Sequence, residues 1–169
     1  MKPIYLCGFM GCGKSYTGRK SARETGIRHI DLDDFLVGRE KMEISEIFKK
    51  YGEKHFRNLE FEALCEISSE VSEFHPAIIS LGGGALTNPE TAAFAKKNAV
   101  VIFIDTPFDT CYERVKNDVS RPNAAGKSKE ELFALYKSRE EHYKKAADYI
   151  KTGGDKEIVS LIKQLSGGE

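Results

Sequence analysis

A glycine-rich segment near the N-terminus, residues 8–15, reads GFMGCGKS and ends in Lys14 and Ser15. Glycines let backbone N–H groups approach phosphate oxygens, the lysine reaches the β and γ phosphates, and the serine hydroxyl can ligate Mg²⁺. The segment follows the apolar run Ile4–Cys7 and precedes a helical pattern, the context that a phosphate-binding loop requires. A glycine turn without a ligand would need neither Lys14 nor Ser15. The predicted nucleotide contacts in this segment are Gly11, Cys12, Gly13, Lys14, Ser15 and Tyr16.

Two acidic residues at predicted strand ends compete for the metal ion that such a loop uses with ATP. Asp105 follows Val100–Ile104, the longest uninterrupted apolar stretch, so hydrophobicity alone favours it. The Thr-Pro pair directly after Asp105 is a good helix start, however, and a carboxylate there has a sufficient role at the positive end of that helix. Asp31, after a shorter apolar run, is the second candidate.

Asp31 also belongs to an acidic cluster. Asp31 and Asp33 are two residues apart, so an extended segment would project both carboxylates to one side while Leu32 points away. One carboxylate could then serve a metal and the other a hydroxyl. The alternative is that the cluster only caps and solvates the helix that begins near Phe35. We assign Asp34 to that capping role.

Two arginines lie on or beside the buried stripes of predicted helices. Arg139 is seven residues after Leu132 and four before Tyr143, the spacing of one helical face. Arg57 has Glu60 one turn further on. A buried guanidinium requires an anion, and two planar guanidinium groups are what recognition of a small carboxylate would use. The alternatives are snorkelling of Arg139 along the core edge and a surface ion pair between Arg57 and Glu60.

Two further arginines and a glycine run have candidate ligand roles. Arg121 lies in a polar stretch, residues 117–128, and could close over the phosphates to neutralise developing charge; a solvated loop cation is the alternative. Arg114 could stack on a nucleobase, although alone it reads as a surface residue. Residues 82–84 are three glycines directly after a predicted strand. Contact between their N–H groups and a small ligand is preferred here over a flexible hinge.

Short apolar runs alternate with amphipathic segments along the chain. The predicted strands are Ile4–Cys7, a short strand ending near Asp31, Ala77–Leu81, Val100–Ile104 and Tyr149–Lys151. This rhythm is typical of βαβ units around a parallel sheet. Helix signals agree with it: Gly26 can close the first helix, Asn88-Pro89 can open another, and Ser128 with Glu131 can form a capping box. The pattern therefore predicts an α/β fold.

The 169 residues are enough for one well-buried core and too few for two comfortable domains, so residues 1–169 are predicted to form a single domain. Between the second strand and Ala77, an insertion of about residues 33–72 carries two helical patterns, Phe35–Tyr51 and Glu53–Val71. One crossover helix needs less chain than this. The insertion is therefore the natural place for a substrate pocket, and residues 117–128 are expected to form a mobile loop.

The composition limits which partners and which cellular location are expected. The 26 Lys and Arg residues balance the 26 Asp and Glu residues, which gives no electrostatic reason to expect nucleic acid or an anionic membrane as a partner. No apolar stretch approaches the length of a bilayer span, and the N-terminus lacks a signal-peptide pattern, so we expect a cytoplasmic protein. The four cysteines are expected to be reduced, the four histidines lack metal-ligand spacing, and a monomer is preferred.

Taken in chain order, the motifs resemble those of shikimate kinase along nearly the whole chain. They are the phosphate-binding loop, Asp31-Leu32-Asp33, Phe56-Arg57, Leu81-Gly82-Gly83-Gly84-Ala85, Arg121-Pro122 and Arg139. The ordered set is far more specific than any single member. The resemblance implies a three-layer P-loop fold with helices on both faces of a five-stranded parallel sheet, in the order 2-3-1-4-5. It also implies a shikimate-binding insertion after the second strand and a lid around Arg121.

The resemblance also implies a role for each matching residue. ATP and Mg²⁺ would be handled by Lys14, Ser15 and Asp31, with Ser15 and Asp31 as the metal ligands. Shikimate would be held by Asp33, Arg57, Gly82, Gly83 and Arg139. Lys14, Asp33 and the lid residue Arg121 would form the catalytic set. Arg114 resembles the arginine that stacks on adenine in this family, and residues 152–155 fall where the family covers the other face of the base.

The chain departs from the family pattern at three places. After Arg121 and its proline, Asn123-Ala124-Ala125 replace the two leucines that are often found, which removes apolar groups from the lid. Tyr16 replaces a threonine after the loop serine, and Cys12 stands where alanine or serine is usual. None of these changes removes a reactive group, but a cysteine at this position can make the loop sensitive to oxidation.

The predicted reaction is in-line transfer of the γ-phosphoryl group of ATP to the 3-hydroxyl of shikimate, as the resemblance implies. Lys14, Arg121 and Mg²⁺ would offset charge on the transferring group, while Asp33 orients the hydroxyl and accepts its proton if a base is needed. Two rival functions share part of the pattern. One is a gluconate-type or other small-metabolite kinase, and the other is a noncatalytic nucleotide switch, which would not need Asp33 and both buried-stripe arginines.

Overall fold

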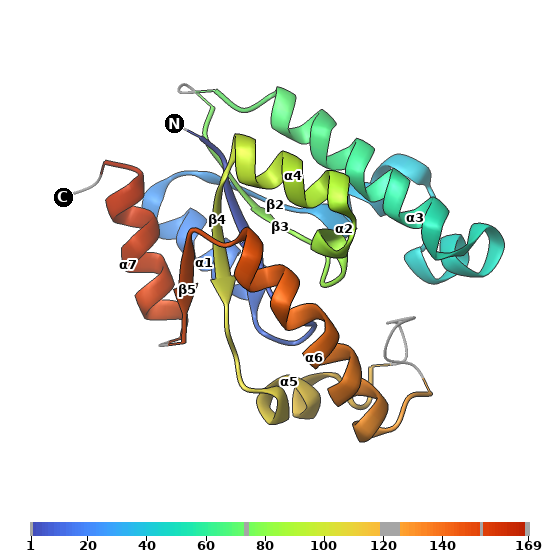
Figure 1. Ribbon diagram of the computed structural model, residues 1–169. Coiled ribbons are helices and arrows are strands. Elements are labelled where there is room, and N and C mark those ends of the chain that lie inside the picture. Colours follow the sequence, from blue (N-terminus) through green and yellow to red (C-terminus); the bar gives the residue numbers. More distant parts are fainter. Residues whose placement is uncertain (1, 73–74, 119–125, 153, 168–169) are drawn as a thin grey trace.

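Five parallel strands form the centre of the molecule, in the order β2-β3-β1-β4-β5 (Figure 1). The computed structural model describes residues 2–72, 75–118, 126–152 and 154–167. The strands are β1 (Ile4–Cys7), β2 (Arg28–Asp31), β3 (Ala77–Ser80), β4 (Val100–Ile104) and β5 (Tyr149–Lys151). The helices are α1 (Lys14–Thr25), α2 (Leu32–Glu40), α3 (Ile44–Ser69), α4 (Pro89–Asn98), α5 (Phe108–Val115), α6 (Lys129–Ala146) and α7 (Asp155–Leu165), with a 3₁₀ turn, η1 (Ala85–Thr87). The predicted fold class and strand order are confirmed.

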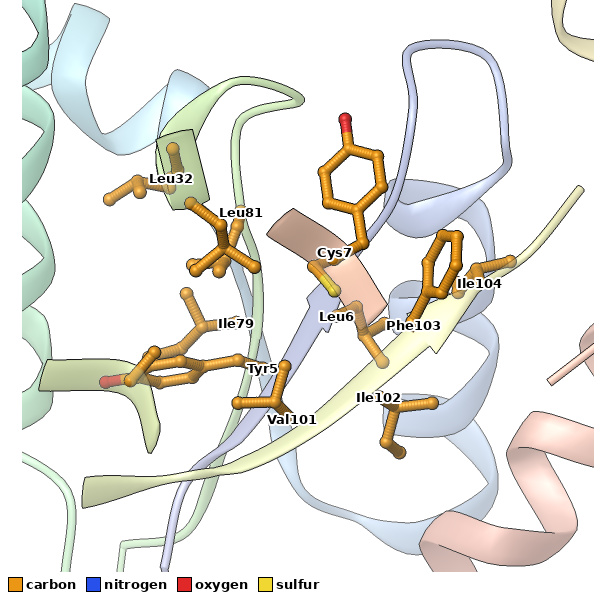
Figure 2. Close-up of a cluster of buried hydrophobic side chains, with 14 of the residues drawn as sticks. Tyr5, Leu6, Cys7, Leu32, Ile79, Leu81, Val101, Ile102, Phe103 and Ile104 are labelled. Carbon is orange, nitrogen blue, oxygen red and sulfur yellow. The ribbon is translucent and has the colours of Figure 1, made fainter. Parts of the chain in front are cut away.

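Side chains on both faces of the sheet are buried, which explains why the central strands are apolar without alternation. Tyr5 pairs in register with Ile79 on one side and Val101 on the other. These three side chains point to one face of the sheet, whereas Leu6 and Ile102 point to the opposite face (Figure 2). All five residues have no exposed surface. The core therefore fixes the carboxyl ends of β1 and β3, and pairing with β3 holds β2 beside them, where the candidate ligand residues begin.

Helices cover both faces of this sheet, as predicted. Helices α1 and α7 pack together on one face, and α4 and α6 pack together on the other (Figure 1). No helix in the described ranges combines the length and the apolar composition that crossing a bilayer requires.

The predicted helix-end signals are present in the structure. Gly26 ends α1 in the left-handed region with φ 73°, and its N–H bonds to the carbonyl of Ala22. Asn88 caps α4 by accepting from the N–H of Glu90. Ser128 and Glu131 form the predicted capping box at the start of α6. These caps set the directions in which the helices leave the sheet.

The insertion after β2 differs from the predicted helix pattern. The expected helix over Phe35–Tyr51 is wrong, because α2 begins at Leu32 and ends at Glu40, and α3 begins at Ile44. Lys41 interrupts the run in a left-handed conformation with φ 54°. The second predicted pattern starts correctly after Gly52, where α3 kinks with φ 82° and ψ 170°.

Candidate active site

The glycine-rich loop connects the end of β1 to the start of α1. Gly8, Gly11 and Gly13 have φ values of 142°, 79° and 102°, a region that side chains with a Cβ rarely adopt. The Lys14 ammonium lies back over the loop, 2.9 Å from the carbonyl oxygen of Gly8 and 3.1 Å from that of Phe9. The loop therefore turns several backbone groups and one cation toward the same small volume.

Asp31 is hydrogen-bonded to the loop, whereas no hydrogen bond among the described residues joins the Asp105 side chain to it. The hydroxyl of Ser15 donates a hydrogen bond to the Asp31 carboxylate. Asp105 instead influences Tyr136 on α6, whose phenol pKa is raised to about 12 by burial and, to a smaller extent, by the nearby Asp105 carboxylate. Of the two acidic candidates, the fold brings only Asp31 to the serine that a nucleotide-bound metal would use.

The acidic cluster also has a different local geometry from the one expected. Asp31 is the N-cap of α2, and its carboxylate accepts from the N–H of Asp33 at 3.1 Å. Asp34 was predicted to cap and solvate the helix start, and the capping part is wrong, since Asp34 lies inside the first helical turn, where it is exposed. The extended geometry predicted for Asp31 to Asp33 is also wrong, because the helix begins at Leu32. The helical turn still brings Asp31 and Asp33 to one cleft.

That cleft has a volume of about 710 Å³ and opens over the phosphate-binding loop. Its lining includes the predicted nucleotide residues Gly11, Gly13, Lys14, Ser15, Tyr16 and Arg114. Arg114 is exposed and donates from Nη1 to the carbonyl oxygen of Gly11 at 2.8 Å. Arg19 also lines the cleft, and no sequence signal had singled it out. We call this space the donor cleft.

A second cleft of about 240 Å³ adjoins the donor cleft, and we call it the acceptor cleft. Its polar lining combines the insertion, the glycine run and α6: Asp33, Arg57, Glu60, Gly82, Gly83, Gly84 and Arg139. Phe48 and Phe56 contribute aromatic walls. Asp33, Asp34 and Gly83 line both clefts. The fold thus gathers all the described residues predicted to bind the acceptor.

Arg57 is buried in the wall of the acceptor cleft. Its Nη1 donates to Glu60 Oε2 at 2.7 Å, and its Nη2 donates to Glu53 Oε1 at 3.0 Å. Only 8% of Arg57 and 1% of Glu60 are exposed. The alternative of a surface ion pair is therefore wrong, although the pair itself forms. The guanidinium is fixed against the helix that carries it.

Glu60 also belongs to the site, although its sequence position predicts only an ion pair with Arg57. Burial raises the pKa of Glu60 to about 7, and the neighbouring Asp33 carboxylate adds to the rise while Arg57 opposes it. Its second oxygen, Oε1, is buried without a hydrogen-bond partner in the described residues. Its spacing from Ala63, Leu64 and Ile67, which are buried on the same helix, would have placed it on the buried face.

Arg139 is 4% exposed, so the snorkelling alternative is wrong. Burial lowers its pKa, and the nearby Arg57 cation lowers it further. Within the described residues, no ion pair joins Arg139 to a carboxylate, although the carboxylates of Glu53 and Glu60 are close enough to favour its charged form. Tyr143, one turn further on α6, donates to the carbonyl oxygen of Gly83. Two buried guanidinium groups therefore share one small cleft.

The glycine run owes its composition to close packing. A Cβ on Gly82 would lie 2.1 Å from Glu60 Oε1, and a Cβ on Gly84 would lie 2.1 Å from Arg57 Nη2 and 2.9 Å from Arg139 Nη2. A side chain at either position would force Glu60 or the two arginines to move, so glycine favours the observed positions of these charged groups whether or not a ligand is bound. This packing requirement was missed, because a run of glycines does not reveal what approaches it.

Three further predictions concern the lid arginine, residues 152–155 and the cysteines. Arg121, with the lid segment 119–125, lies outside the described residues. Of residues 152–155, Asp155 begins α7 and forms a 2.6 Å ion pair with Lys20 on α1. All four cysteines are free thiols: Cys7, Cys12, Cys65 and Cys111. Burial raises the pKa of Cys111 to about 12, which keeps that thiol protonated near neutrality.

The donor set suits a metal that arrives with phosphate. No group of three or more His, Cys, Asp or Glu residues in the described ranges forms a closed metal site. The hydroxyl of Ser15 and the carboxylate of Asp31 meet at the end of the loop. Mg²⁺ prefers one or two such oxygen ligands together with substrate phosphates and water. The residues present therefore fit Mg²⁺ carried in with a nucleotide.

Comparison with known proteins agrees with this geometry. A family model described as shikimate kinase matches residues 10–166. A shikimate kinase of Macrococcus caseolyticus is 36% identical over 161 residues, which cover 95% of this chain and 92% of the relative. A shikimate kinase of Staphylococcus aureus is 40% identical over 145 residues, covering 86% and 80%.

A solved structure of shikimate kinase from Acinetobacter baumannii in complex with shikimate superposes with a TM-score of 0.85 at 30% identity. The match covers 98% of this chain and 92% of that one. The shikimate kinase structure from Aquifex aeolicus gives a TM-score of 0.78 at 35% identity, with coverage of 98% and 96%.

Proposed function

This chain belongs to the shikimate kinase family, and from that premise we propose that the donor and acceptor clefts are the two halves of one phosphotransfer site. Family members are ATP-dependent phosphotransferases that act on a hydroxyl group, in the shikimate pathway of aromatic amino-acid biosynthesis. The proposed reaction transfers the γ-phosphoryl group of ATP to the 3-hydroxyl of shikimate, giving ADP and shikimate 3-phosphate.

The observation that carries this proposal is the position of Asp33. It lines both clefts, between the phosphate-binding loop and the two buried arginines. A carboxylate at that boundary is within reach of an acceptor hydroxyl and of the phosphoryl group that it would attack. Asp33 orients the hydroxyl in the proposed mechanism and accepts its proton late, because the transition state for phosphoryl transfer is largely loose.

Charge in the donor cleft is matched to the nucleotide phosphates. The loop N–H groups and Lys14 bind the β and γ phosphates in this proposal, and Lys14 leaves the carbonyls of Gly8 and Phe9 to do so. Ser15 and Asp31 would hold Mg²⁺, which when bound neutralises charge on the phosphate oxygens. Arg121 is proposed as an additional cation from the lid, and Arg114 and Tyr16 as contacts to the nucleoside.

Charge in the acceptor cleft is matched to a carboxylate. Arg57 and Arg139 are both buried, and Arg57 is paired with Glu60 and Glu53, whereas no ion pair among the described residues joins Arg139 to a carboxylate. Burying a cation without compensation is unfavourable, so an anionic ligand fits the space between them. Shikimate supplies a carboxylate and ring hydroxyls, and the N–H groups of Gly82 and Gly83 are proposed as further contacts. The proposed enzyme is a monomer in the cytoplasm.

The test is coupled ADP release from ATP and Mg²⁺, with and without shikimate. Strong stimulation by shikimate, together with a phosphorylated acceptor in the product mixture, is the expected result. Gluconate and other polyhydroxy acids serve as the comparison panel. Stimulation by gluconate and not by shikimate, or ADP release that no acceptor changes, would contradict the proposal.

A further inference from the structure

Arg57, which lines the acceptor cleft, also pairs with a carboxylate that the proposed mechanism does not use. Glu53 is the first residue after the kink of α3 at Gly52, and its Oε1 lies 3.0 Å from Arg57 Nη2. Its side chain is 57% exposed, in contrast to the 1% exposure of Glu60 on the same arginine. The two glutamates therefore hold Arg57 in different ways, one from inside the core and one from the rim.

The position of Arg57 Nη2 shows which ligand group would compete with Glu53. Arg57 Nη2 and Arg139 Nη2 lie 2.1 Å and 2.9 Å from the same point above Gly84, the point that a Cβ would occupy. A ligand carboxylate bridging the two guanidinium groups would use these nitrogens. Glu53 already accepts a hydrogen bond from one of them, and its negative charge also acts on Arg139.

The charges around Arg57 imply that Glu53 and a ligand carboxylate would compete for Nη2. Glu60 is buried and paired with Nη1, so water cannot readily replace Arg57 as its partner. Glu53 can leave Nη2 for water at a smaller cost, since its own side chain is 57% exposed. An incoming carboxylate meets attraction from two guanidinium groups and repulsion from Glu53.

We infer that Glu53 is a competing partner of Arg57, which occupies this arginine in the empty acceptor cleft and is displaced by the carboxylate of the acceptor. This inference rests on the proposed function. An acceptor with a carboxylate replaces the lost ion pair, whereas a neutral polyol leaves Glu53 in place. Glu53 thus lowers the affinity for anionic acceptors at this arginine and leaves the affinity for neutral acceptors unchanged.

The experiment measures shikimate binding to the wild type, Glu53→Gln and Glu53→Ala by titration calorimetry without nucleotide, and steady-state kinetics of the same proteins. The dissociation constant and the KM for shikimate should fall about twofold to fivefold in both variants, the range expected for an ion pair with one solvent-exposed partner. The kcat and the KM for ATP should stay unchanged, because Glu53 is not among the residues that line the donor cleft.

A matched control is available on the same helix. Glu66 pairs with Arg39 at 3.3 Å and its side chain is 52% exposed, but Arg39, unlike Arg57, lines neither cleft. Glu66→Gln should leave the shikimate dissociation constant unchanged. The methyl ester of shikimate supplies a second control, since it lacks the competing charge and should bind the wild type and Glu53→Gln equally.

Several outcomes would overturn the inference. An unchanged or raised dissociation constant in the Glu53 variants would show that Glu53 supports Arg57 or is irrelevant to it. Equal gains for shikimate and its methyl ester would show that carboxylates do not compete for this arginine. A wild type that neither binds nor phosphorylates shikimate would instead contradict the proposed function, and this inference with it.

Discussion

The donor and acceptor clefts recognise their ligands by different means. The donor cleft takes its phosphate-binding groups from one contiguous segment, whose glycines, lysine and serine lie within eight residues, although other elements complete its lining. The acceptor cleft draws Arg57 from α3, the glycine run from the end of β3 and Arg139 from α6. Backbone recognition needs a local conformation, whereas recognition by buried side chains needs the whole fold. We therefore expect the donor cleft to keep its function after substitutions that disrupt the acceptor cleft.

The largest expected effect tests the donor half. Lys14→Met should lower kcat at saturating substrates by about 10²- to 10³-fold, because a positioned charge on the transferring group is lost. The shikimate dissociation constant should stay within about twofold of the wild type, since the acceptor cleft does not contain Lys14. Steady-state kinetics and calorimetry measure the two effects. Lys137→Met, an exposed lysine on α6, is the control, and a normal kcat in Lys14→Met would refute the donor assignment.

The next effect tests the acceptor half. Arg139→Met should raise the KM for shikimate about 30-fold or more, the loss expected when one partner of a desolvated charge pair is removed. The KM for ATP should change little. Arg39→Met removes an arginine paired with Glu40 and Glu66 outside both clefts, and should leave both constants unchanged. Equal losses of ATP and shikimate affinity in Arg139→Met would mean that the two halves are not separable.

Gly84→Ala should break the acceptor half through packing alone. The new Cβ would meet Arg57 Nη2 at 2.1 Å and its Cζ at 2.6 Å, so the guanidinium must move. We expect the KM for shikimate to rise about tenfold, from displacement of a group that positions the ligand. Gly38→Ala, where a Cβ meets nothing within 4 Å, is the control. A Gly84→Ala enzyme with a wild-type KM for shikimate would argue against a fixed position for Arg57.

The smallest effect concerns stability. The pKa of Glu60 is raised to about 7 by burial, above the ordinary value of 4.5, so the folded state binds a proton that the unfolded state has released between these values. The free energy of unfolding should therefore fall as pH rises from about 4.5 to 7, and then level off. Relative to Glu60→Gln, the wild type should lose about 1 to 3 kcal/mol over this window. Urea unfolding of the wild type and Glu60→Gln at pH 5 and pH 8 measures this difference. An equal change with pH in the free energy of unfolding of the two proteins would contradict the prediction.

Much of the fold was predictable because local signals agreed with one another. The apolar runs gave the strands, and Gly26, Asn88 and the Ser128–Glu131 box gave helix ends that the structure contains. The insertion was less predictable. The helix expected from Phe35 begins at Leu32, because the carboxylate of Asp31 at the strand end caps it directly.

The candidate site was predictable where chemistry follows from a motif. The loop residues and Asp31 meet as expected, and the buried-stripe position of Arg139 was visible in its spacing from Leu132 and Tyr143. The spacing along α3 places Glu60 on the buried face, but it does not separate Glu60 from Glu53, which is seven residues earlier and one helical turn from Arg57. The exposure of Glu53 depends on where the packing of α3 against the rest of the fold ends, which a one-dimensional pattern does not contain.

The central claim is that Asp33 joins two separate clefts into one reaction site. The most direct test is the turnover of Asp33→Asn at saturating ATP and shikimate, with the binding of each ligand measured separately. We predict a fall in kcat of about tenfold to a hundredfold with both ligand affinities largely kept, since positioning and proton transfer at the hydroxyl are lost. Asp109→Asn, an exposed change on α5, is the control. Near-normal turnover in Asp33→Asn would contradict the account.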